Sequence, residues 1–414
     1  MVIGNIWNLF SKSHGINAGT SIFYDLYVND KIGHKIVSTI ECEALDLNQT
    51  RHFMQQKMKH IVKKYPHFGS SIINHNWMKV EDLNYDKLVI VCDKKRDEVA
   101  NEILNSTFDS ELPSWQVIIT NDNCILFICD HTYGDGAYIA NVVRELLDDD
   151  SLNNLPLKNQ KGKSLSFFSR IILFFKIIYL IYRRFTLIKK PPSAPWREPN
   201  NGQIEIATLS LAGLKELRNR FSCSDGTRLS INDLIHTIIT RANSVYLKKG
   251  TISSAAMFNM RSNMADFNDQ NKIGYILLTN KVCNDGMPEE VLREVHDFMQ
   301  FYKLTPATAI ISKLMHLYYA WNREKACKLL RDLNSSVDFI ISNYMFEYKD
   351  KHIQHGIKIV NAFGTVTPCD ANQMYSISTY GDKVNIYLTY NKDVITDVEK
   401  LREEFDNAMK WLCQ

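Results

Sequence analysis

The sequence predicts a two-domain globular protein in which short strands alternate with amphipathic helices. The chain has 414 residues, which is more than one hydrophobic core usually serves. Three prolines between residues 189 and 195 form its clearest break, because proline disfavours the continuation of regular structure. We therefore expect an N-terminal half at residues 1–160, a linker at 161–195 and a C-terminal half at 196–414.

The composition argues against several classes of protein. Hydrophobic residues make up 45% and charged residues 23% of the chain, as in ordinary globular proteins. The net charge of +3 predicts no strong affinity for nucleic acid. The nine cysteines form no Cys-x-x-Cys pair, which favours reduced thiols over a disulfide or zinc framework, and we expect no metal site. The first residues lack a basic start and a long apolar run, so we expect no signal peptide.

Hydrophobic periodicity assigns the elements of both halves. In the N-terminal half it predicts helices at 51–64 and 97–104, two strands within 20–43, and strands at 87–91, 112–119 and 124–129. Ser230 precedes an apolar run at 231–242, where a hydroxyl side chain would cap a long buried helix. The other elements expected in the C-terminal half are strands at 204–211, 255–262, 337–342, 376–380 and 384–390, and helices at 214–221 and 401–412.

The chemistry of the chain centres on His131. Five apolar residues at 125–129 predict a buried strand that delivers Asp130 and His131, and a turn with Gly134 follows. Apolar residues then recur at helical spacing from Ile139 to Leu147. His131 thus lies where a core strand gives way to a turn and a helix, a rigid mount for a general base whose unperturbed pKa is near neutrality. A hydrogen-bonded structural histidine is the alternative.

The linker carries an unusual basic and apolar segment at residues 164–188. Eight basic residues and no acidic one lie between Lys161 and Lys190, and Lys176 interrupts the apolar run. A transmembrane helix needs about 18 uninterrupted apolar residues, so the pattern favours an amphipathic helix lying in the plane of an anionic membrane surface. A crossover helix with a solvated basic edge and a single membrane span are the alternatives.

Several separated motifs resemble one family. The run from His131 to Gly136 resembles the His-x-x-x-Asp-Gly signature of CoA-dependent acyltransferases. Other stretches resemble motifs of the wax ester synthase/diacylglycerol acyltransferases within that superfamily: Pro113-Ser114-Trp115, the Asn-Asp motif in Ser230-Ile231-Asn232-Asp233, and the hairpin Ser378-Thr379-Tyr380-Gly381. The chain departs from the family at Asp130, where the family usually has a first histidine, and at Ser114, where it has leucine.

The resemblance implies an α/β fold of two chloramphenicol-acetyltransferase-like domains with mixed sheets and an interdomain tunnel around His131. It implies an O-acyltransferase that moves a long acyl chain from acyl-CoA to a fatty alcohol or diacylglycerol, with His131 as general base, no covalent intermediate and no cofactor besides the acyl-CoA substrate. We expect it at the cytoplasmic face of the endoplasmic reticulum or plasma membrane. The alternative is a member that binds acyl-CoA or lipid without turnover.

The same resemblance suggests roles for other site residues. Asp135 could orient the imidazole, or it could brace the loop through an ion pair with Arg261, as related enzymes do; we favour the second. Gly136 would let the backbone approach the substrate closely. Asn232 could steady the tetrahedral oxyanion or simply cap a helix.

Two further residues complete the expected site. Asp233, the second residue of the Asn-Asp motif, is expected to help bind substrate. Trp115 lies on the strand expected to pair with the one that presents His131. It could therefore line the substrate site or serve only as a core anchor.

Overall fold

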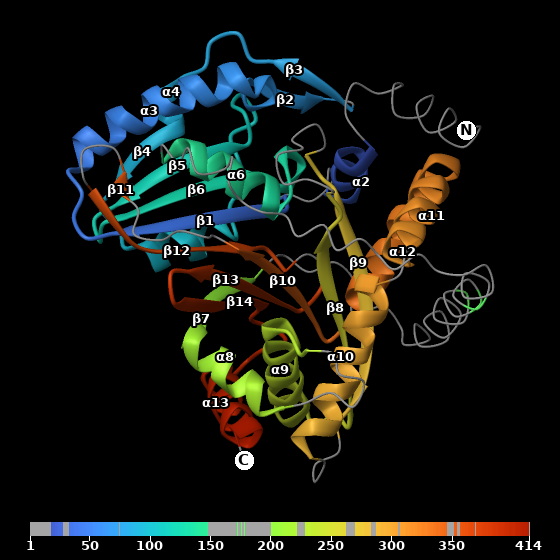
Figure 1. The fold of residues 1–414 in the computed structure, drawn as a ribbon. Coiled ribbons are helices and arrows are strands. Elements are labelled where there is room, and N and C mark those ends of the chain that lie inside the picture. Colours follow the sequence, from blue (N-terminus) through green and yellow to red (C-terminus); the bar gives the residue numbers. More distant parts are fainter. Residues whose placement is uncertain are drawn as a thin grey trace.

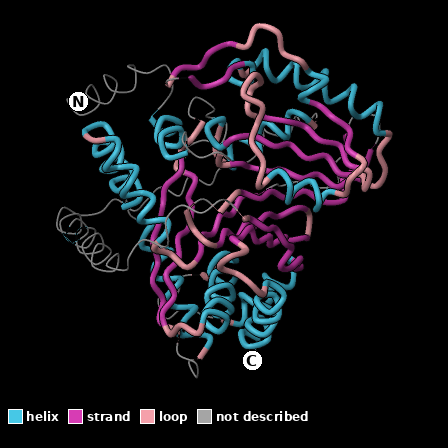
Figure 2. Tube along the Cα trace, turned by 180° about the vertical axis from the view of Figure 1, so that it is seen from behind, coloured by secondary structure: helices cyan, strands magenta, loops and turns pink. Residues whose placement is uncertain are grey.

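The computed structural model contains two six-stranded mixed sheets and a separate two-stranded hairpin. It describes residues 18–27, 33–73, 75–147, 172, 175, 178, 200–221, 228–261, 270–282, 287–304, 307–345, 352–353, 357–368 and 370–413. Figure 1 shows one sheet above the other, and Figure 2 shows from behind that most helices lie outside the strands. The expected α/β class with two mixed sheets is therefore confirmed.

The N-terminal sheet is buried on both faces. Its strands, in spatial order, are β11 (His352–Ile353), β12 (Ile357–Val366), β1 (Lys35–Cys42), β6 (Cys124–Asp130), β5 (Trp115–Thr120) and β4 (Val89–Cys92). Alternate residues of β6 enter different cores: Phe127 packs in the core that includes α3 (Leu47–Lys64), and Leu126 packs in the core that includes α5 (Arg96–Ile103). Burial on both faces explains why the sequence of β6 is a continuous apolar run.

The C-terminal sheet has its own core. Its strands, in order, are β7 (Asn201–Ser210), β14 (Lys383–Asn391), β13 (Gln373–Tyr380), β10 (Phe339–Met345), β8 (Thr251–Asn259) and β9 (Ile273–Lys281). The helices α8 (Leu211–Arg220), α9 (Ile231–Leu247) and α13 (Val398–Cys413) contribute apolar side chains to that core and lie below the sheet in Figure 1. The predicted cap is confirmed, because the Ser230 hydroxyl accepts from the backbone of Asp233 at the start of α9.

The predicted division of the chain at residues 161–195 does not divide the two sheets. Strands β11 and β12 come from the C-terminal part of the sequence, yet β12 pairs with β1 in the N-terminal sheet, with Ile36 opposite Val366. A strand can pair with a strand that is distant in the sequence. The composition of the linker does not indicate which strands pair across it. Of the linker itself, only Ile172, Phe175 and Ile178 lie within the described residues.

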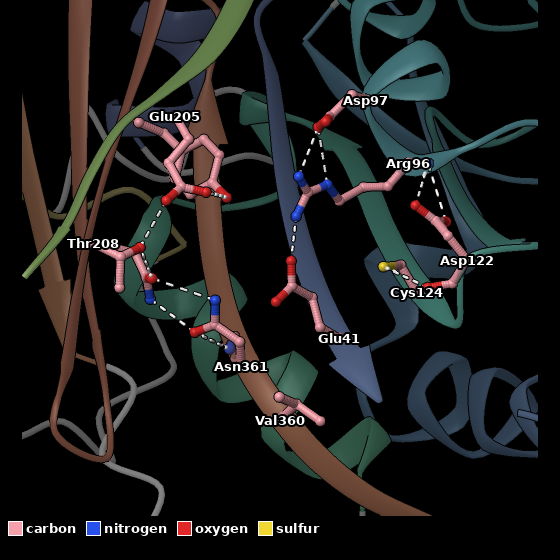
Figure 3. Close-up of polar contacts among 12 residues, drawn as sticks. Glu41, Arg96, Asp97, Asp122, Cys124, Glu205, Thr208, Val360 and Asn361 are labelled. Atoms are coloured by element: carbon pink, nitrogen blue, oxygen red, sulfur yellow. Dashed lines mark hydrogen bonds and ion pairs between the residues drawn. The ribbon is translucent and has the colours of Figure 1, made fainter. Parts of the chain in front are cut away.

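Polar side chains join the two sheets next to β12. Asn361 of β12 and Asn385 of β14 exchange amide hydrogen bonds of 2.9 and 3.3 Å, and the hydroxyl of Thr208 on β7 donates to Asn385 (Figure 3). The rings of Phe363 and Tyr387 stack with centroids 4.0 Å apart. Strand β12 is therefore paired within the N-terminal sheet and bonded through its side chains to the C-terminal sheet.

One of the two strands predicted within residues 20–43 is wrong. Residues 18–27 form helix α2 (Ala18–Tyr27), and only β1 is a strand. Leu26 is buried in a small core with Tyr319, Ala326 and Cys327, and Ile22 and Phe23 pack against it. Tyr319 belongs to α11 (Ala307–Trp321), and Ala326 and Cys327 belong to α12 (Arg323–Ser335). Packing against α11 and α12 therefore decides that this segment is a helix, and the local sequence pattern does not contain that information.

Candidate active site

His131 begins a single 3₁₀ turn between β6 and helix α6 (Gly136–Leu146). The backbone N–H of His131 donates to the carbonyl of His34 at 2.6 Å, which continues the pairing of β6 with β1. Asp130 caps the turn by accepting from the backbone N–H of Thr132 at 2.9 Å and from its hydroxyl at 2.6 Å. Asp130, where the family usually has histidine, therefore fixes the backbone that carries His131.

The imidazole of His131 is held by an amide from a distant segment. Its Nδ1 lies 3.1 Å from Oδ1 of Asn271. The ring also lies nearly parallel to the rings of Phe23, with centroids 4.2 Å apart, and His34, with centroids 4.7 Å apart. His34 is itself fixed, because its Nε2 donates to the carbonyl of Thr367 at 3.0 Å. The ring plane of the candidate base is thus set by contacts from three separate segments of the chain.

Burial determines the charge of the two stacked histidines. Desolvation lowers the pKa of His131 from 6.5 to about 4, although the nearby Asp135 carboxylate opposes the shift. Desolvation also lowers the pKa of His34 well below its usual value, and the nearby His131 adds to that effect. Both rings are therefore neutral at pH 7, and a neutral imidazole is the form that can accept a proton.

Asp135 lies in a buried ion pair. Its carboxylate oxygens are 2.8 and 2.9 Å from the same guanidinium nitrogen of Arg261, and both side chains are 1% exposed. The same carboxylate accepts from the backbone N–H of Tyr138 at 3.0 Å, capping α6, and from that of Lys272 at 2.8 Å. These contacts match the bracing role suggested for Asp135 rather than a hydrogen bond to the imidazole.

Two glycines in the turn have different constraints. A Cβ on Gly136 would lie 3.6 Å from the Tyr344 ring, an ordinary contact. A Cβ on Gly134 would instead collide with the buried ring of Tyr138. The close contact within the protein is therefore at Gly134, where the ring of Tyr138 lies against the turn, and the expected approach of substrate to Gly136 stays a prediction.

Trp115 occupies the position of a core anchor. Its side chain is fully buried, its Nε1 donates to the carbonyl of Phe68 at 2.6 Å, and it pairs across the sheet with Cys129. The ring belongs to the core beneath α3. These contacts favour the packing role for Trp115 over contact with substrate.

Asn232 and Asp233 lie at the start of α9 and do not hydrogen-bond His131 in the described part of the chain. Asn232 accepts a hydrogen bond from the amide of Asn343 on β10. Asp233 is buried, accepts from the backbone N–H of Ser230 at 2.8 Å, and lies 2.8 Å from Nδ1 of His296. Asn343 precedes Tyr344, whose ring packs on Gly136, so β10 connects Asn232 to the His131 turn.

Sequence reasoning missed four residues around His131: Thr20, Phe23, His34 and Asn271. Phe23 and Thr20 come from α2, which was predicted as a strand, and Asn271 is 140 residues from His131 in the chain. None lies in a recognisable motif. The one available signal was the glycine before His34, since Gly33 has a φ of +69° and a Cβ there would meet Asp130 at 2.7 Å.

Comparisons with known proteins give one family-domain match and a shared fold. The sequence model of the WS/DGAT C-terminal domain matches residues 270–412. The wax ester synthase/diacylglycerol acyltransferase from Marinobacter aquaeolei VT8 has a similar structure, with a TM-score of 0.58, 13% identity, and coverage of 96% of this chain and 98% of that one. No curated protein sequence matches the chain.

Two further solved structures share the fold. The trichothecene 15-O-acetyltransferase of Fusarium sporotrichioides gives a TM-score of 0.67 at 12% identity and covers 95% of this chain and 93% of its own. The starter condensation domain of rhizomide synthetase, solved with C8-CoA and Leu-SNAC, gives 0.60 at 9% identity and covers 98% and 96%. Residues 270–412 therefore match the WS/DGAT C-terminal domain, and the chain shares its fold with these three solved structures.

Proposed function

We propose that the protein is an O-acyltransferase that moves a long-chain acyl group from acyl-CoA to the hydroxyl of a fatty alcohol or diacylglycerol. The observation that carries the proposal is the neutral imidazole of His131 on the His-x-x-x-Asp-Gly turn, braced by the ion pair between Asp135 and Arg261. The match of residues 270–412 to the WS/DGAT C-terminal domain supports the reaction class.

The proposed chemistry needs one base and no covalent enzyme intermediate. As the acceptor oxygen attacks the thioester carbonyl carbon, Nε2 of His131 takes the hydroxyl proton. The new C–O bond forms, the C–S bond breaks, and the imidazolium returns the proton to the departing CoA sulfur. Acyl-CoA is then a substrate, and the scheme requires no further cofactor.

We propose that the donor and acceptor meet at His131 in a tunnel between the two domains. Asn232 remains the candidate for steadying the oxyanion, because β10 connects it to the residue that packs on Gly136. Asp233 would support Asn232 from within the helix start rather than contact substrate, since its carboxylate bonds to Ser230 and His296.

An assay of neutral-lipid products tests the proposal. Purified protein would be incubated with labelled palmitoyl-CoA and either hexadecanol or diacylglycerol, and the lipids separated. We expect a labelled ester with at least one acceptor and none with His131→Ala. Saturable binding of palmitoyl-CoA without any ester, across several acceptors, would instead favour the alternative of a binding protein without turnover.

We also propose that residues 164–188 contact a membrane surface at the cytoplasmic face of an intracellular membrane. Ile172, Phe175 and Ile178 are helical, and their side chains are 45% to 68% exposed. Helix α11 presents a second exposed apolar stripe in Leu314, Leu317 and Trp321, 49% to 84% exposed. Within the described residues, no helix is long and apolar enough to cross a bilayer. Apolar side chains on a basic segment favour peripheral binding to anionic lipid.

Vesicle flotation tests the membrane contact. Replacing Ile172, Phe175 and Ile178 by glutamine should reduce flotation with phosphatidylserine-containing vesicles, and high salt should reduce it further. A matched control replaces Met287 and Val394, which are also exposed apolar residues, by glutamine. Equal flotation of the triple variant and the control would contradict contact through this segment.

A further inference from the structure

Asn271 is fixed in one orientation by its hydrogen bonds. Its Nδ2 lies 3.1 Å from the carbonyl oxygen of His131, 3.4 Å from that of Thr132 and 3.2 Å from the hydroxyl of Thr20. Carbonyl oxygens only accept hydrogen bonds, so this end of the amide must be the NH₂ group. The other end, Oδ1, therefore faces Nδ1 of His131 and must accept from it.

This orientation determines which nitrogen of His131 carries the proton. A neutral imidazole has one N–H and one lone pair. Because Asn271 Oδ1 can only accept, the proton belongs on Nδ1 and the lone pair on Nε2. Nε2 makes no hydrogen bond among the described residues, so it is the nitrogen left to accept a proton.

We propose that Asn271 is a positioning residue that holds His131 in the Nδ1–H tautomer and so leaves Nε2 ready to take the hydroxyl proton. The proposal rests on the proposed acyltransferase function. It adds a residue from the segment preceding β9, far along the chain from the His131 turn.

The residues on either side of Asn271 show why this segment is suited to the role. The carbonyl of Gln270 accepts from the backbone N–H of Asp135 at 2.9 Å, and the backbone N–H of Lys272 donates to the Asp135 carboxylate at 2.8 Å. Three consecutive residues thus bind either His131 or Asp135. The segment positions the turn through Asp135, and the side chain of Asn271 hydrogen-bonds the imidazole of His131.

The tautomer can be measured directly. A long-range proton–nitrogen NMR spectrum of protein labelled with ¹⁵N-histidine, with His131→Gln to assign the signal, should show His131 protonated at Nδ1. Asn271→Ala should give a mixture of tautomers and lower kcat by roughly 100-fold, as expected for a misplaced catalytic group, while KM for acyl-CoA stays near the wild-type value. Asn271→Asp keeps an acceptor and should recover part of the lost kcat. Its added charge should also move the acid limb of the rate profile to higher pH.

A matched control separates positioning from packing. Asn243 is also a buried asparagine, whose amide donates to the carbonyl of Ile239 and the hydroxyl of Tyr375. Asn243→Ala should lower thermal stability and leave the tautomer and the pH profile unchanged. The proposal is overturned if Asn271→Ala retains a single Nδ1–H tautomer, whether or not its stability falls. A fully active His131→Ala enzyme would defeat the catalytic scheme instead, and the tautomer measurement would still stand.

Discussion

Each half of the molecule has a buried carboxylate at the start of a helix, Asp135 at α6 and Asp233 at α9. The two differ in how far along the sequence their binding partners lie. Asp135 caps α6 and binds Arg261 and Lys272, which lie 126 and 137 residues away in the chain. Asp233 lies in the first turn of α9 and binds Ser230 and His296, three and 63 residues away. Asp135 thus joins β6 to distant segments, whereas Asp233 stabilises one domain locally. The candidate base, His131, lies near Asp135, the carboxylate whose partners are more distant in the sequence.

The largest difference should come from removing a histidine that interacts with each carboxylate, His131 near Asp135 and His296 beside Asp233. His131→Ala should reduce turnover by roughly 10²- to 10⁴-fold, as expected when a general base is lost, with acyl-CoA affinity close to normal. His296→Ala should lower stability and leave the rate per folded molecule nearly unchanged. Comparable rate losses in the two variants would remove the distinction between the sites.

Breaking the Asp135 ion pair should affect both stability and rate. Asp135→Asn removes the charge that faces the buried guanidinium of Arg261, which typically costs about 3–5 kcal/mol of unfolding free energy. Chemical denaturation of Asp135→Asn, Arg261→Gln and the double variant should show strongly non-additive losses. If Asp135→Asn instead lost activity at unchanged stability, an orienting role would replace the bracing role.

Breaking the Asp233 capping box should cost less. Asp233→Ala removes acceptors for Ser230 and His296 and should lower the unfolding free energy by about 1–3 kcal/mol. The kinetic constants of the folded fraction should stay near those of the wild type. A raised KM for the acceptor lipid, without any loss of stability, would return Asp233 to the substrate site.

Low pH should act on both domains. Burial lowers the pKa of His131 and of His236, which lies near Asp233, to about 4. Each folded pKa lies below the unfolded value of about 6.5, so the unfolded chain binds more protons and stability falls as pH drops from about 6.5 toward 4. Because the base must be neutral, the acid limb of kcat/KM should lie near pH 4. An acid limb near pH 6.5 would contradict the shift assigned to His131.

The smallest difference concerns the first residue of each helix. Gly136→Ala should change the unfolding free energy by no more than about 1 kcal/mol, because the added methyl has room beside Tyr344. Ile231→Ala at the start of α9 provides the comparison. A large rate loss in Gly136→Ala, without a change in melting temperature, would show that substrate approaches the backbone there.

The part of the fold that could be predicted from sequence is the part formed by local patterns. The strand, turn and helix around His131 follow from an apolar run, glycines and a 3.6-residue period, and the cap at Ser230 follows from its own neighbours. The helical state of α2, the crossing of β12 and the contact of Asn271 with His131 depend on segments more than 100 residues apart. No single-sequence period carries that information.

The crossing of β12 has a consequence for biosynthesis. While residues 1–160 leave the ribosome, the edge of β1 that later pairs with β12 has no partner, and it gains one only after residue 366 has been made. An exposed strand edge readily pairs with other chains, and long-range pairing slows folding. The edge of β1 therefore stays unpaired until residue 366 has been made, and the turn that carries His131 can take its final form only after that point.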